Sequence, residues 1–531
     1  MESISHFFNS VSTAVPKRLE QQDVKKVVSV SAAIAVLYTA YKIASNSSKK
    51  RAARKQGLKE IPVPGGSYPI FGHLLSLGSN PSKTISKWHK ELGPIINLNM
   101  GVKTWTMISC PVLAHKIFVV HGAQTSNRIH QTYSSQYYSL GGLGTAFAQP
   151  GPSWKEARAV IASALSPKLI DTKYMGLVEE EATKLVDRLI AYSKAGNGVD
   201  PNKHLHLNSL NIVFSVGFGK RYENIEDPEF SHVSKCIVRS IELGSLENDL
   251  ASFIPAYFIV DYFTGSETVM RDFVENERNP RYRALMAEGL TREGPNVVKS
   301  LENFNITADE KLVIMSDLLA GGTDTVSTTL SWNFALMCHY PEVQKRAADE
   351  IDKFVQEHGR FPNFSERTKV PFCVATYKEC MRFRPTTPFG IPHCTNEDVV
   401  IDGYLIKKNT AIISSMESIH RNPDFYPEPE RFYPERYLAN LKTMHAAANG
   451  KLEERDTFNF GFGRRVCACV YLAEVELFVS FIQVLGRCTI EPIVDSDGVA
   501  HIPDIDNPVS TLTSAPAPYK VMFVPRKNPA Y

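Results

Sequence analysis

The chain has 531 residues, roughly two to three times the length of a typical domain, so it can bury a sizeable core. Its hydrophobic fraction of 43% and charged fraction of 22% are those of an ordinary globular protein. A formal net charge of +3 is too small to suggest a nucleic-acid partner. The nine cysteines lack the regular spacing of a disulfide scaffold, so we expect a reducing, cytosol-facing environment.

The only long apolar run without charge lies near the N-terminus, at residues 27–41 (VVSVSAAIAVLYTAY). Extended to residue 44, with Lys42 able to snorkel, it approaches the roughly twenty residues that a hydrocarbon core requires. Basic residues between positions 49 and 55 follow it and favour retention of that side in the cytoplasm. We therefore predict a membrane anchor within residues 1–48. A cleaved signal peptide and a buried amphipathic helix are the alternatives.

The segment after the basic residues is rich in proline and glycine. Residues 61–66 (IPVPGG) combine two prolines, which fix φ, with two glycines, which permit a sharp turn. We interpret residues 49–66 as a basic cluster and a stiff hinge, and residues 67–531 as one domain with a mainly α (α+β) fold. The longest helical patterns cover residues 175–195, 307–338 and 341–358, and the β-rich segments cover 94–107 and 399–413, the latter with a turn at Asp402-Gly403.

The most informative stretch is residues 460–469 (FGFGRRVCAC), which precedes an apolar helical pattern. Cys467 lies where this glycine-bearing loop enters the helix, and the helix dipole there lowers the pKa of a thiolate. Such a thiolate can ligate iron, while Phe460 can pack beside the sulfur and Arg465 can pair with a carboxylate. Zinc or iron–sulfur binding by a Cys-x-Cys pair is the alternative, but it needs four ligands and only one distant cysteine follows.

Four residues of this stretch match F-x-x-G-x-R-x-C, and the match resembles the haem-ligand signature of the cytochrome P-450 superfamily. They are Phe460, Gly463, Arg465 and Cys467. The resemblance implies that Cys467 is the axial ligand of the iron of haem b and that the other three residues bind the cofactor. Cys469 is a departure, because the family usually has glycine there, so the packing or hydrogen bonding of that helix turn can be altered.

A second motif, residues 320–325 (AGGTDT), lies inside a long apolar helical pattern. Its paired glycines each cost about 1 kcal/mol relative to alanine, so something must need the missing side chains or a loosened turn. Asp324 and Thr325 supply an acid next to a hydroxyl, which suits a proton relay. The pair resembles the family's oxygen-activation motif and implies a catalytic role, although Val326 replaces the usual threonine or serine. A helix kink without chemistry is the alternative.

A third motif pairs an acid and a base one helical turn apart, Glu379 and Arg382. Alone, such a pair is a common surface contact worth a few tenths of a kcal/mol. Arg384-Pro385 follows at once, and Arg436 lies in a later PERY segment. Both features resemble family patterns. The resemblance implies that Glu379, Arg382 and Arg436 form a buried structural triad that holds the cysteine loop.

A fourth pattern places Trp154 and Arg158 on one face of a helix. An aromatic–arginine stacking pair is the ordinary explanation for that spacing. The pattern resembles the contact that the family makes with one haem propionate, and His393 falls where the family often has a residue for the other propionate. All four motifs occur in family order, so the resemblance covers nearly the whole chain.

The resemblance, which is to fungal microsomal members in overall character, implies a helical haem domain with a small β-rich lobe. It further implies a monooxygenase that inserts one atom of O2 into a C–H bond of a lipophilic small molecule, steroid-like in our interpretation. Electrons would come from NADPH through a separate NADPH–cytochrome P-450 reductase. We expect the catalytic domain to face the cytosol at the endoplasmic reticulum membrane.

Substrate and partner positions follow only from their place in the motif order. We expect Phe147, Ala320, Phe389 and Ile391 to face the substrate. Lys155 and Arg464 are candidate docking charges for the reductase, although such residues usually form an ordinary solvated face. Two other functions stay open: a haem-thiolate isomerase or dehydratase that needs neither O2 nor a reductase, and a haem sensor or carrier without turnover.

Overall fold

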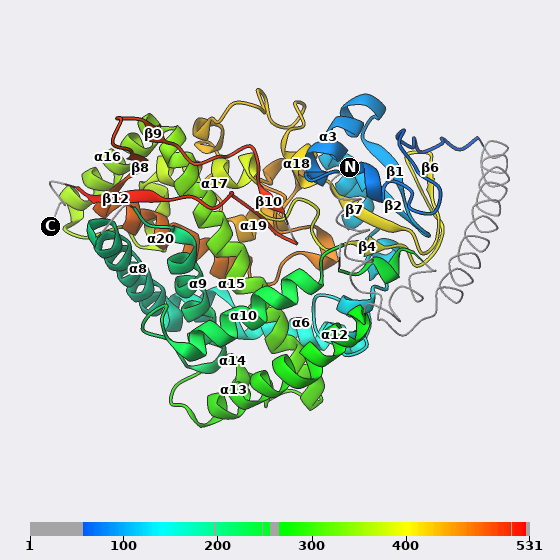
Figure 1. Ribbon diagram of the computed structural model, residues 1–531, viewed down its shortest axis with the longest axis horizontal. Coiled ribbons are helices and arrows are strands. Elements are labelled where there is room, and N and C mark those ends of the chain that lie inside the picture. Colours follow the sequence, from blue (N-terminus) through cyan, green and yellow to red (C-terminus); the bar gives the residue numbers. More distant parts are fainter. Residues whose placement is uncertain (1–56, 196–197, 247, 255–264, 511, 527–531) are drawn as a thin grey trace, which may run out of the picture.

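The computed structural model describes residues 57–195, 198–246, 248–254, 265–510 and 512–526 (Figure 1). The fold is mainly helical, and strands β1, β2, β4, β6 and β7 gather at one side of the molecule. The helices are α3 (Pro81–Leu92), α4 (Pro111–His115), α5 (Gly122–Thr125), α6 (Pro152–Ala164), α7 (Pro167–Leu169), α8 (Met175–Ala195), α9 (Pro201–Phe218), α10 (Pro228–Leu243), α12 (Ser266–Asp272), α13 (Asn279–Thr291), α14 (Val297–Leu301), α15 (Ala308–His339), α16 (Pro341–His358), α17 (Pro371–Phe383), α18 (Met416–His420), α19 (Met444–Asn449) and α20 (Val470–Arg487). The strands are β1 (Ile95–Met100), β2 (Lys103–Ile108), β3 (Asn127–Arg128), β4 (His393–Cys394), β5 (Val399–Ile401), β6 (Tyr404–Ile406), β7 (Ala411–Ser414), β8 (Cys488–Val494), β9 (Ala500–His501), β10 (Val509–Ser510), β11 (Ser514–Ala515) and β12 (Val521–Pro525).

The three long helices predicted from the sequence are confirmed as α8, α15 and α16. Their ends follow from local chemistry. Thr307 and Glu310 form a capping box that satisfies backbone donors at the start of α15. Helix α16 begins with Pro341, whose fixed φ suits the first helical turn, and Gly359, with a φ of 68°, caps its C-terminal end.

The predicted β-rich segments are also confirmed. Strands β1 and β2 form an antiparallel pair, and β7 adds to β2 in parallel in a sheet of order β1-β2-β7-β4-β3. Asp402 and Gly403 have φ values of 50° and 85° and make the turn between β5 and β6. The sheet therefore joins strands from both ends of the domain, as β1 and β2 precede the long helices and β4 and β7 follow them.

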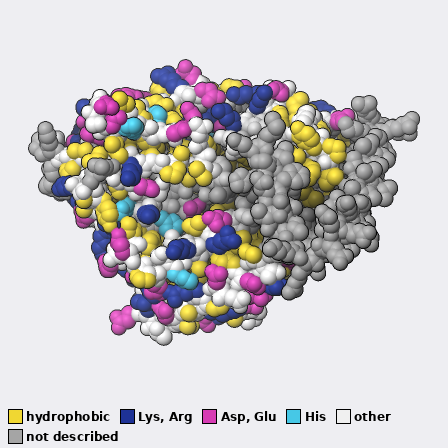
Figure 2. Space-filling view, in the orientation of Figure 1, with side chains coloured by type: hydrophobic (Ala, Val, Ile, Leu, Met, Phe, Trp, Pro, Cys, Tyr) yellow, Lys and Arg dark blue, Asp and Glu magenta, His cyan; other side chains and the backbone are white. Residues whose placement is uncertain are grey.

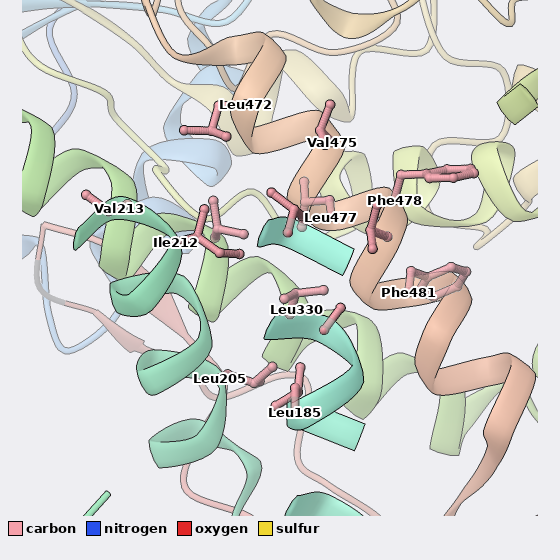
Figure 3. Close-up of a cluster of buried hydrophobic side chains, with 14 of the residues drawn as sticks. Leu185, Leu205, Ile212, Val213, Leu330, Leu472, Val475, Leu477, Phe478 and Phe481 are labelled. Carbon is pink, nitrogen blue, oxygen red and sulfur yellow. The ribbon is translucent and has the colours of Figure 1, made fainter. Parts of the chain in front are cut away.

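The main hydrophobic core lies between α8, α9, α15 and α20. Figure 3 shows Leu185 of α8, Leu205 of α9 and Leu330 of α15 together with Leu477 and Phe478 of α20, and all five are buried. Two of these helices carry or follow a motif found in the sequence, residues 320–325 in α15 and the cysteine loop before α20. The core thus fixes the position of one motif relative to the other.

The predicted membrane anchor and the basic residues after it lie outside the described residues. None of the helices in the described part of the chain is long and apolar enough to cross a membrane. The proline- and glycine-rich segment is described from residue 57 onward, and it contacts the domain. The carbonyl oxygen of Pro62 accepts a hydrogen bond of 2.8 Å from the Asn97 N–H, and that of Pro64 lies 3.0 Å from His73 Nε2. The segment is therefore attached to the folded body.

Charged side chains of both signs are intermixed on the face of the molecule drawn in Figure 2. Several form ion pairs at the surface, such as Lys345 with Asp349 at 2.6 Å and Lys184 with Glu180 at 2.5 Å. Exposed pairs of this kind contribute little to stability because water screens them. The mixture of signs agrees with the small net charge of the chain.

The paired glycines of α15 allow a matched stability test. A Cβ on Gly322 would lie 2.6 Å from Cγ2 of Val213 in α9, whereas a Cβ on Gly321 would meet no atom within 4 Å. We expect Gly322→Ala to lower the free energy of unfolding by about 1–3 kcal/mol through overpacking. Gly321→Ala should leave it unchanged or raise it by up to about 1 kcal/mol through helix propensity. Thermal unfolding midpoints measure both, and equal midpoints for the two variants would contradict the packing assignment.

Candidate functional site

Cys467 lies just before α20, and its side chain is exposed. Its N–H donates a hydrogen bond of 2.9 Å to the carbonyl of Phe460, which closes the loop, and its sulfur accepts one of 3.4 Å from the N–H of Cys469. Hydrogen bonding from Cys469 and the positive charge of Arg158 lower the pKa of the Cys467 thiol to about 7. The sulfur is thus set up to act as a thiolate ligand.

Gly463 is required by close packing of the cysteine loop against a neighbouring helical turn, η2 (Lys116–Val120). Its φ is 53°, and a Cβ would lie 2.4 Å from the carbonyl oxygen of Phe118. Phe462 stacks on Phe118 with ring centroids 5.4 Å apart. The absence of a side chain at Gly463 therefore allows the cysteine loop to pack directly on the backbone of η2.

Arg158 and Arg465 lie close enough for their charges to interact. Arg158 donates from Nη2 to the carbonyl of Val466 at 2.8 Å, and Arg465 donates to the carbonyls of Ser126 and Ala148 at 2.9 and 2.6 Å. Burial, together with the nearby charge of Arg158, lowers the pKa of Arg465 to about 9. Backbone carbonyls thus hold Arg465 in place, and its pairing with a carboxylate stays a prediction.

Trp154 lies between these two arginines. Its ring centroid is 4.3 Å from Cζ of Arg465 and 5.6 Å from Cζ of Arg158, so both guanidinium groups approach one indole. The indole N–H donates to the carbonyl of Thr145 at 3.2 Å. His393 approaches the same region from β4, where its Nδ1 lies 2.9 Å from the carbonyl of Thr125. The structure thus collects the residues of the fourth motif around the cysteine loop.

Arg128 is a further member of this group that the sequence analysis missed. Its side chain is buried, and it donates hydrogen bonds of 2.8 Å to the carbonyls of Ala146 and Ile391. Burial and the charges of Arg465 and Arg158 hold its pKa well below the ordinary value. Arg128 belongs to no local motif, and only the pairing of β3 with β4 brings it here, so the sequence held no signal for it.

The acid–hydroxyl motif lies on one uninterrupted helix, because α15 continues through both glycines. Gly321 borders open space, while Gly322 packs against α9. The hydroxyl of Thr325 donates to the carbonyl of Gly321 at 2.7 Å, and Oδ2 of Asp324 accepts from the hydroxyl of Thr513 at 2.7 Å. The two glycines therefore occur for different reasons. Gly321 borders open space beside the helix, and Gly322 allows α9 to pack closely.

A second carboxylate of α15, Asp317, was also missed by the sequence analysis. Its Oδ2 accepts hydrogen bonds from the N–H groups of Thr145 and Ala146 at 2.7 and 3.0 Å. Burial raises the pKa of this carboxyl group. Asp317 thereby ties the loop before α6 to the helix that carries Asp324.

The four residues expected to face the substrate come from three places. Ala320 is half-buried next to Gly321 on α15. Phe389 is half-buried against the cluster under the five-stranded sheet, and the backbone of Ile391 accepts from Arg128. Phe147 packs against Tyr138 with ring centroids 5.5 Å apart. Phe147 thus belongs to a separate aromatic cluster around Tyr138, and the four are not brought into one contact group.

The predicted triad is assembled around a fully buried carboxylate. Arg382 donates to both oxygens of Glu379 at 2.7 and 2.8 Å, and Nε of Arg436 lies 3.0 Å from Oε2 of the same group. The N–H of Tyr433 donates to Oε1 at 2.7 Å. The spacing of Glu379 and Arg382 therefore marks a buried pair, and the surface alternative does not apply.

A model of the cytochrome P-450 family matches residues 62–523. The chain belongs to the cytochrome P-450 family. Cytochrome P-450 1A1 of Opsanus tau is 28% identical over 492 residues, which cover 87% of this chain and 91% of its own. Cytochrome P-450 monooxygenase drtD of Aspergillus calidoustus is 28% identical over 474 residues, which cover 88% and 86%. A zebra fish cytochrome P-450 solved with progesterone has a TM-score of 0.69 at 24% identity, covering 84% of this chain and 99% of that one.

Family membership makes the protein a monooxygenase with a haem-iron cofactor that uses O2 and NADPH-derived electrons. The enzyme class, the cofactor and the mainly helical cytochrome P-450 fold expected from the sequence are thereby confirmed. The residues around Cys467 fit such a cofactor. An exposed thiol of lowered pKa suits the iron, and the mutually repelling arginines Arg128, Arg158 and Arg465 suit two propionate groups.

The two loop glycines provide a matched test of the cysteine loop. We expect Gly463→Ala to disrupt the loop, because its Cβ would collide with the backbone of η2. Gly461→Ala is the control, because Gly461 also has a positive φ of 76° but a Cβ there meets its nearest atom at 3.8 Å. Absorbance of the reduced carbon monoxide complex should be largely lost only in Gly463→Ala. Equal loss in both variants would mean that φ, and not contact with η2, makes Gly463 necessary.

The triad predicts a large stability effect of one neutral substitution. Glu379→Gln leaves the buried Arg382 and the half-buried Arg436 without a carboxylate, so we expect a loss of about 3–5 kcal/mol in the free energy of unfolding. Asp349→Asn removes the acid of the exposed pair with Lys345 and should cost at most about 0.5 kcal/mol. Thermal unfolding of both proteins provides the comparison. A change below 1 kcal/mol for Glu379→Gln would be incompatible with a structural role for the triad.

Proposed function

We propose that Cys467 is the axial ligand of the iron of haem b in this monooxygenase. The observation that carries the proposal is the position of its sulfur, which is exposed at the start of α20 and receives the N–H of Cys469 at 3.4 Å. A ligand there keeps its negative charge, because hydrogen bonds and Arg158 stabilise the thiolate. Phe460, Gly463 and Arg465 hold the loop that presents it.

The haem, when bound, supplies the iron at which O2 is activated, and thiolate ligation favours cleavage of the O–O bond. The chain's own cations bind and orient the cofactor. Arg128, Arg158 and Arg465 would neutralise the two propionates, with Trp154 and His393 completing the group. Each guanidinium already has backbone acceptors, so its direction is fixed before the cofactor binds.

Asp324 and Thr325 would move protons toward the reacting oxygen. The Thr325 hydroxyl is bound to the carbonyl of Gly321, which places it at the glycine that borders open space. Asp324 is held by Thr513 through one carboxylate oxygen, so it keeps a second oxygen for exchange. The Thr325 hydroxyl thus lies near the open space, and Asp324 is the adjacent acid that can supply it with protons, as general acid catalysis requires.

The substrate class we propose is a lipophilic small molecule of steroid type. Ala320 on α15 and the half-buried side chains of Phe389 and Ile391 are apolar, which suits a non-polar ligand. Phe147, also predicted to face the substrate, packs in the separate cluster around Tyr138. The zebra fish cytochrome P-450 of similar fold was solved with progesterone, and this supports a steroid as the first compound to test.

The redox partner we propose is a separate NADPH–cytochrome P-450 reductase at the endoplasmic reticulum membrane. Lys155 and Arg464 are both exposed close to the cysteine loop, Lys155 on α6 next to Trp154 and Arg464 three residues before Cys467. Positive charges there would attract an acidic partner surface. The membrane location follows from the predicted N-terminal anchor.

The ligand assignment predicts a spectroscopic result. The reduced wild-type protein with carbon monoxide should show the strongly red-shifted Soret band of thiolate-ligated haem, and Cys467→Ala should not. Cys469→Ala is the matched control, because it removes the other thiol of the loop, and it should keep the band. A band that survives in Cys467→Ala and disappears in Cys469→Ala would transfer the ligand role to Cys469.

The relay assignment predicts altered use of electrons. With purified reductase, NADPH and progesterone, we expect Thr325→Ala to keep its haem but to release most of the reducing equivalents as hydrogen peroxide, because the hydroxyl that guides the proton is gone. Thr325→Ser retains a hydroxyl and should couple NADPH to product as wild type does. Product and peroxide formed per NADPH are the measured quantities.

Turnover assays with and without NADPH also separate the monooxygenase from the two other functions, an isomerase or dehydratase and a haem sensor or carrier. Conversion of a peroxide substrate without NADPH would favour an isomerase or dehydratase. Failure to transform steroids, fatty acids and aromatic compounds in the reduced, aerobic enzyme would favour a haem sensor or carrier. Turnover of a fatty acid but of no steroid would overturn only the substrate class.

A further inference from the structure

Arg278 is a buried cation that none of the sequence motifs uses. It ends the π-helical turn η6 (Phe273–Arg278), and the residue is 0% exposed. Its hydrogen-bond acceptors are neutral: Nη2 donates to the carbonyl of Tyr138 and to Oδ1 of Asn279, each at 2.8 Å, and Nε donates to the same Oδ1 at 3.0 Å. Nη1 is fully enclosed and has no hydrogen-bond partner within the described residues, among which Arg278 also forms no ion pair. A buried guanidinium is strongly unfavourable unless an acid compensates its charge, so Arg278 lacks the partner that its burial requires.

An aromatic ring lies against this guanidinium group. Cζ of Arg278 is 4.7 Å from the ring centroid of Tyr138. Tyr133, which belongs with Tyr138 to the π-helical turn η3 (Thr132–Tyr138), packs on it with ring centroids 6.0 Å apart. Both tyrosines are buried in one hydrophobic cluster with residues of α10 and η6. The face of a ring attracts a cation but carries no formal charge, so Tyr138 orients Arg278 without neutralising it.

Two hydroxyl groups near Arg278 are also enclosed and have no hydrogen-bond partner in the described ranges, those of Tyr133 and Ser240. The ring of Tyr133 reaches the C-terminal end of α10, because a Cβ on Gly244 would lie 3.7 Å from its Cδ1. Ser240 lies four residues earlier, on the same face of α10. Burial raises the pKa of Tyr133 to about 12, and both the charge of Arg278 and the Ser240 hydroxyl oppose that rise. A guanidinium N–H and two hydroxyls are therefore gathered around Tyr133, and all three can donate.

This group of donors adjoins the residues predicted to face the substrate. Phe147 packs edge-on against Tyr138, with ring centroids 5.5 Å apart. Asp317 of α15 accepts hydrogen bonds of 2.7 and 3.0 Å from two backbone N–H groups of the loop that leads to Phe147. Asp317 and Gly321, which borders open space, are four residues apart and lie on the same face of α15. One loop thus connects the aromatic cluster that holds Arg278 to the helix of the proposed reaction site.

We propose that Arg278 binds a carboxylate of the lipophilic substrate, with the Tyr133 and Ser240 hydroxyls as further donors. The inference rests on the proposed function, because it names the polar group that the substrate of that same site carries. A carboxylate accepts from Nη1 and from both hydroxyls, and it also supplies the negative charge that the guanidinium lacks. The carbonyl of a ketone or an ester accepts hydrogen bonds but leaves the charge uncompensated. An acid should therefore bind more tightly than a neutral ester with the same hydrocarbon body.

The test measures binding of matched acids and esters to the full chain loaded with haem. Lithocholic acid with its methyl ester provides a steroid pair, and lauric acid with its methyl ester provides a fatty-acid pair. Equilibrium dialysis gives each Kd without relying on turnover or on the haem spectrum. In wild type we expect the acid of at least one pair to bind about ten-fold more tightly than its ester, because its hydrogen bonds to Arg278 are charge-assisted.

The variants assign this preference to one residue. Arg278→Gln removes the charge and should abolish the preference for the acid. Arg271→Gln is the matched control, because Arg271 is an exposed arginine of the neighbouring α12, and it should keep the wild-type ratio. Equal affinities of acid and ester in wild type would mean that ordered water satisfies Arg278, and the proposal would be wrong. A preference for the acid that survives in Arg278→Gln would assign the carboxylate to another cation and is equally contrary to it.

Two further variants decide the question if Arg278→Gln does not fold. Tyr133→Phe and Ser240→Ala each remove one hydroxyl without changing the charge, and each should weaken binding of the acid about three- to ten-fold while leaving the ester unchanged. Unchanged binding of the acid in both variants overturns the site. An Arg278-dependent preference for lauric acid without binding of either steroid overturns only the proposed steroid class. A wild-type protein without the thiolate band in its carbon monoxide complex overturns only the proposed iron ligand.

Discussion

The buried carboxylate of Glu379 is the interaction on which the cysteine loop depends. It fixes Arg382, whose Nη1 donates to the carbonyl of His420 at 2.9 Å, and Nε2 of His420 in turn accepts from the N–H of Phe458 at 2.9 Å. Asn459 donates back to the carbonyl of Met381 in α17 at 2.9 Å. A closed circuit of hydrogen bonds therefore leads from one acid to the residues that precede Cys467.

The second constraint is electrostatic. Burial and the charges of nearby arginines lower the pKa values of Arg128 and Arg465. Arg128, Arg158 and Arg465 are each held by neutral carbonyl groups. Carbonyl dipoles fix the direction of a guanidinium but do not cancel its charge. An anionic cofactor bound beside these guanidinium groups would therefore relieve part of their mutual repulsion.

Structural features formed by residues that are close together in the sequence could be predicted from it. The long helices, the Asp402-Gly403 turn and the pairing of Glu379 with Arg382 all follow from spacing along one element. Arg128 and Asp317 could not be found in this way. Each acts through a partner brought near by tertiary structure, Arg128 through the loop before β4 and Asp317 through the loop before α6.

The paired glycines of α15 also show what could not be predicted from the sequence. Sequence alone indicated that a mid-helix pair must have a cause, and it could not assign different causes to Gly321 and Gly322. Only the position of Val213 on α9 separates the glycine that borders open space from the one that admits a neighbouring helix. Helix propensity marks these glycines as unusual, and only the packing of neighbouring helices shows why each is present.

Cys469, the departure from the family pattern, can be understood on the same basis. Its φ of −103° and ψ of 17° lie in a region open to any residue, so the backbone does not require glycine there. Its N–H still reaches the sulfur of Cys467 at 3.4 Å, so the substitution preserves the backbone hydrogen bond to the proposed ligand. What the cysteine adds is a second thiol that hydrogen-bonds the first and stays protonated, since the pKa of Cys469 is raised well above its ordinary value. Hydrogen bonds to a ligating sulfur withdraw charge from it, so this chain is expected to donate less electron density to its iron than a relative with glycine at that position.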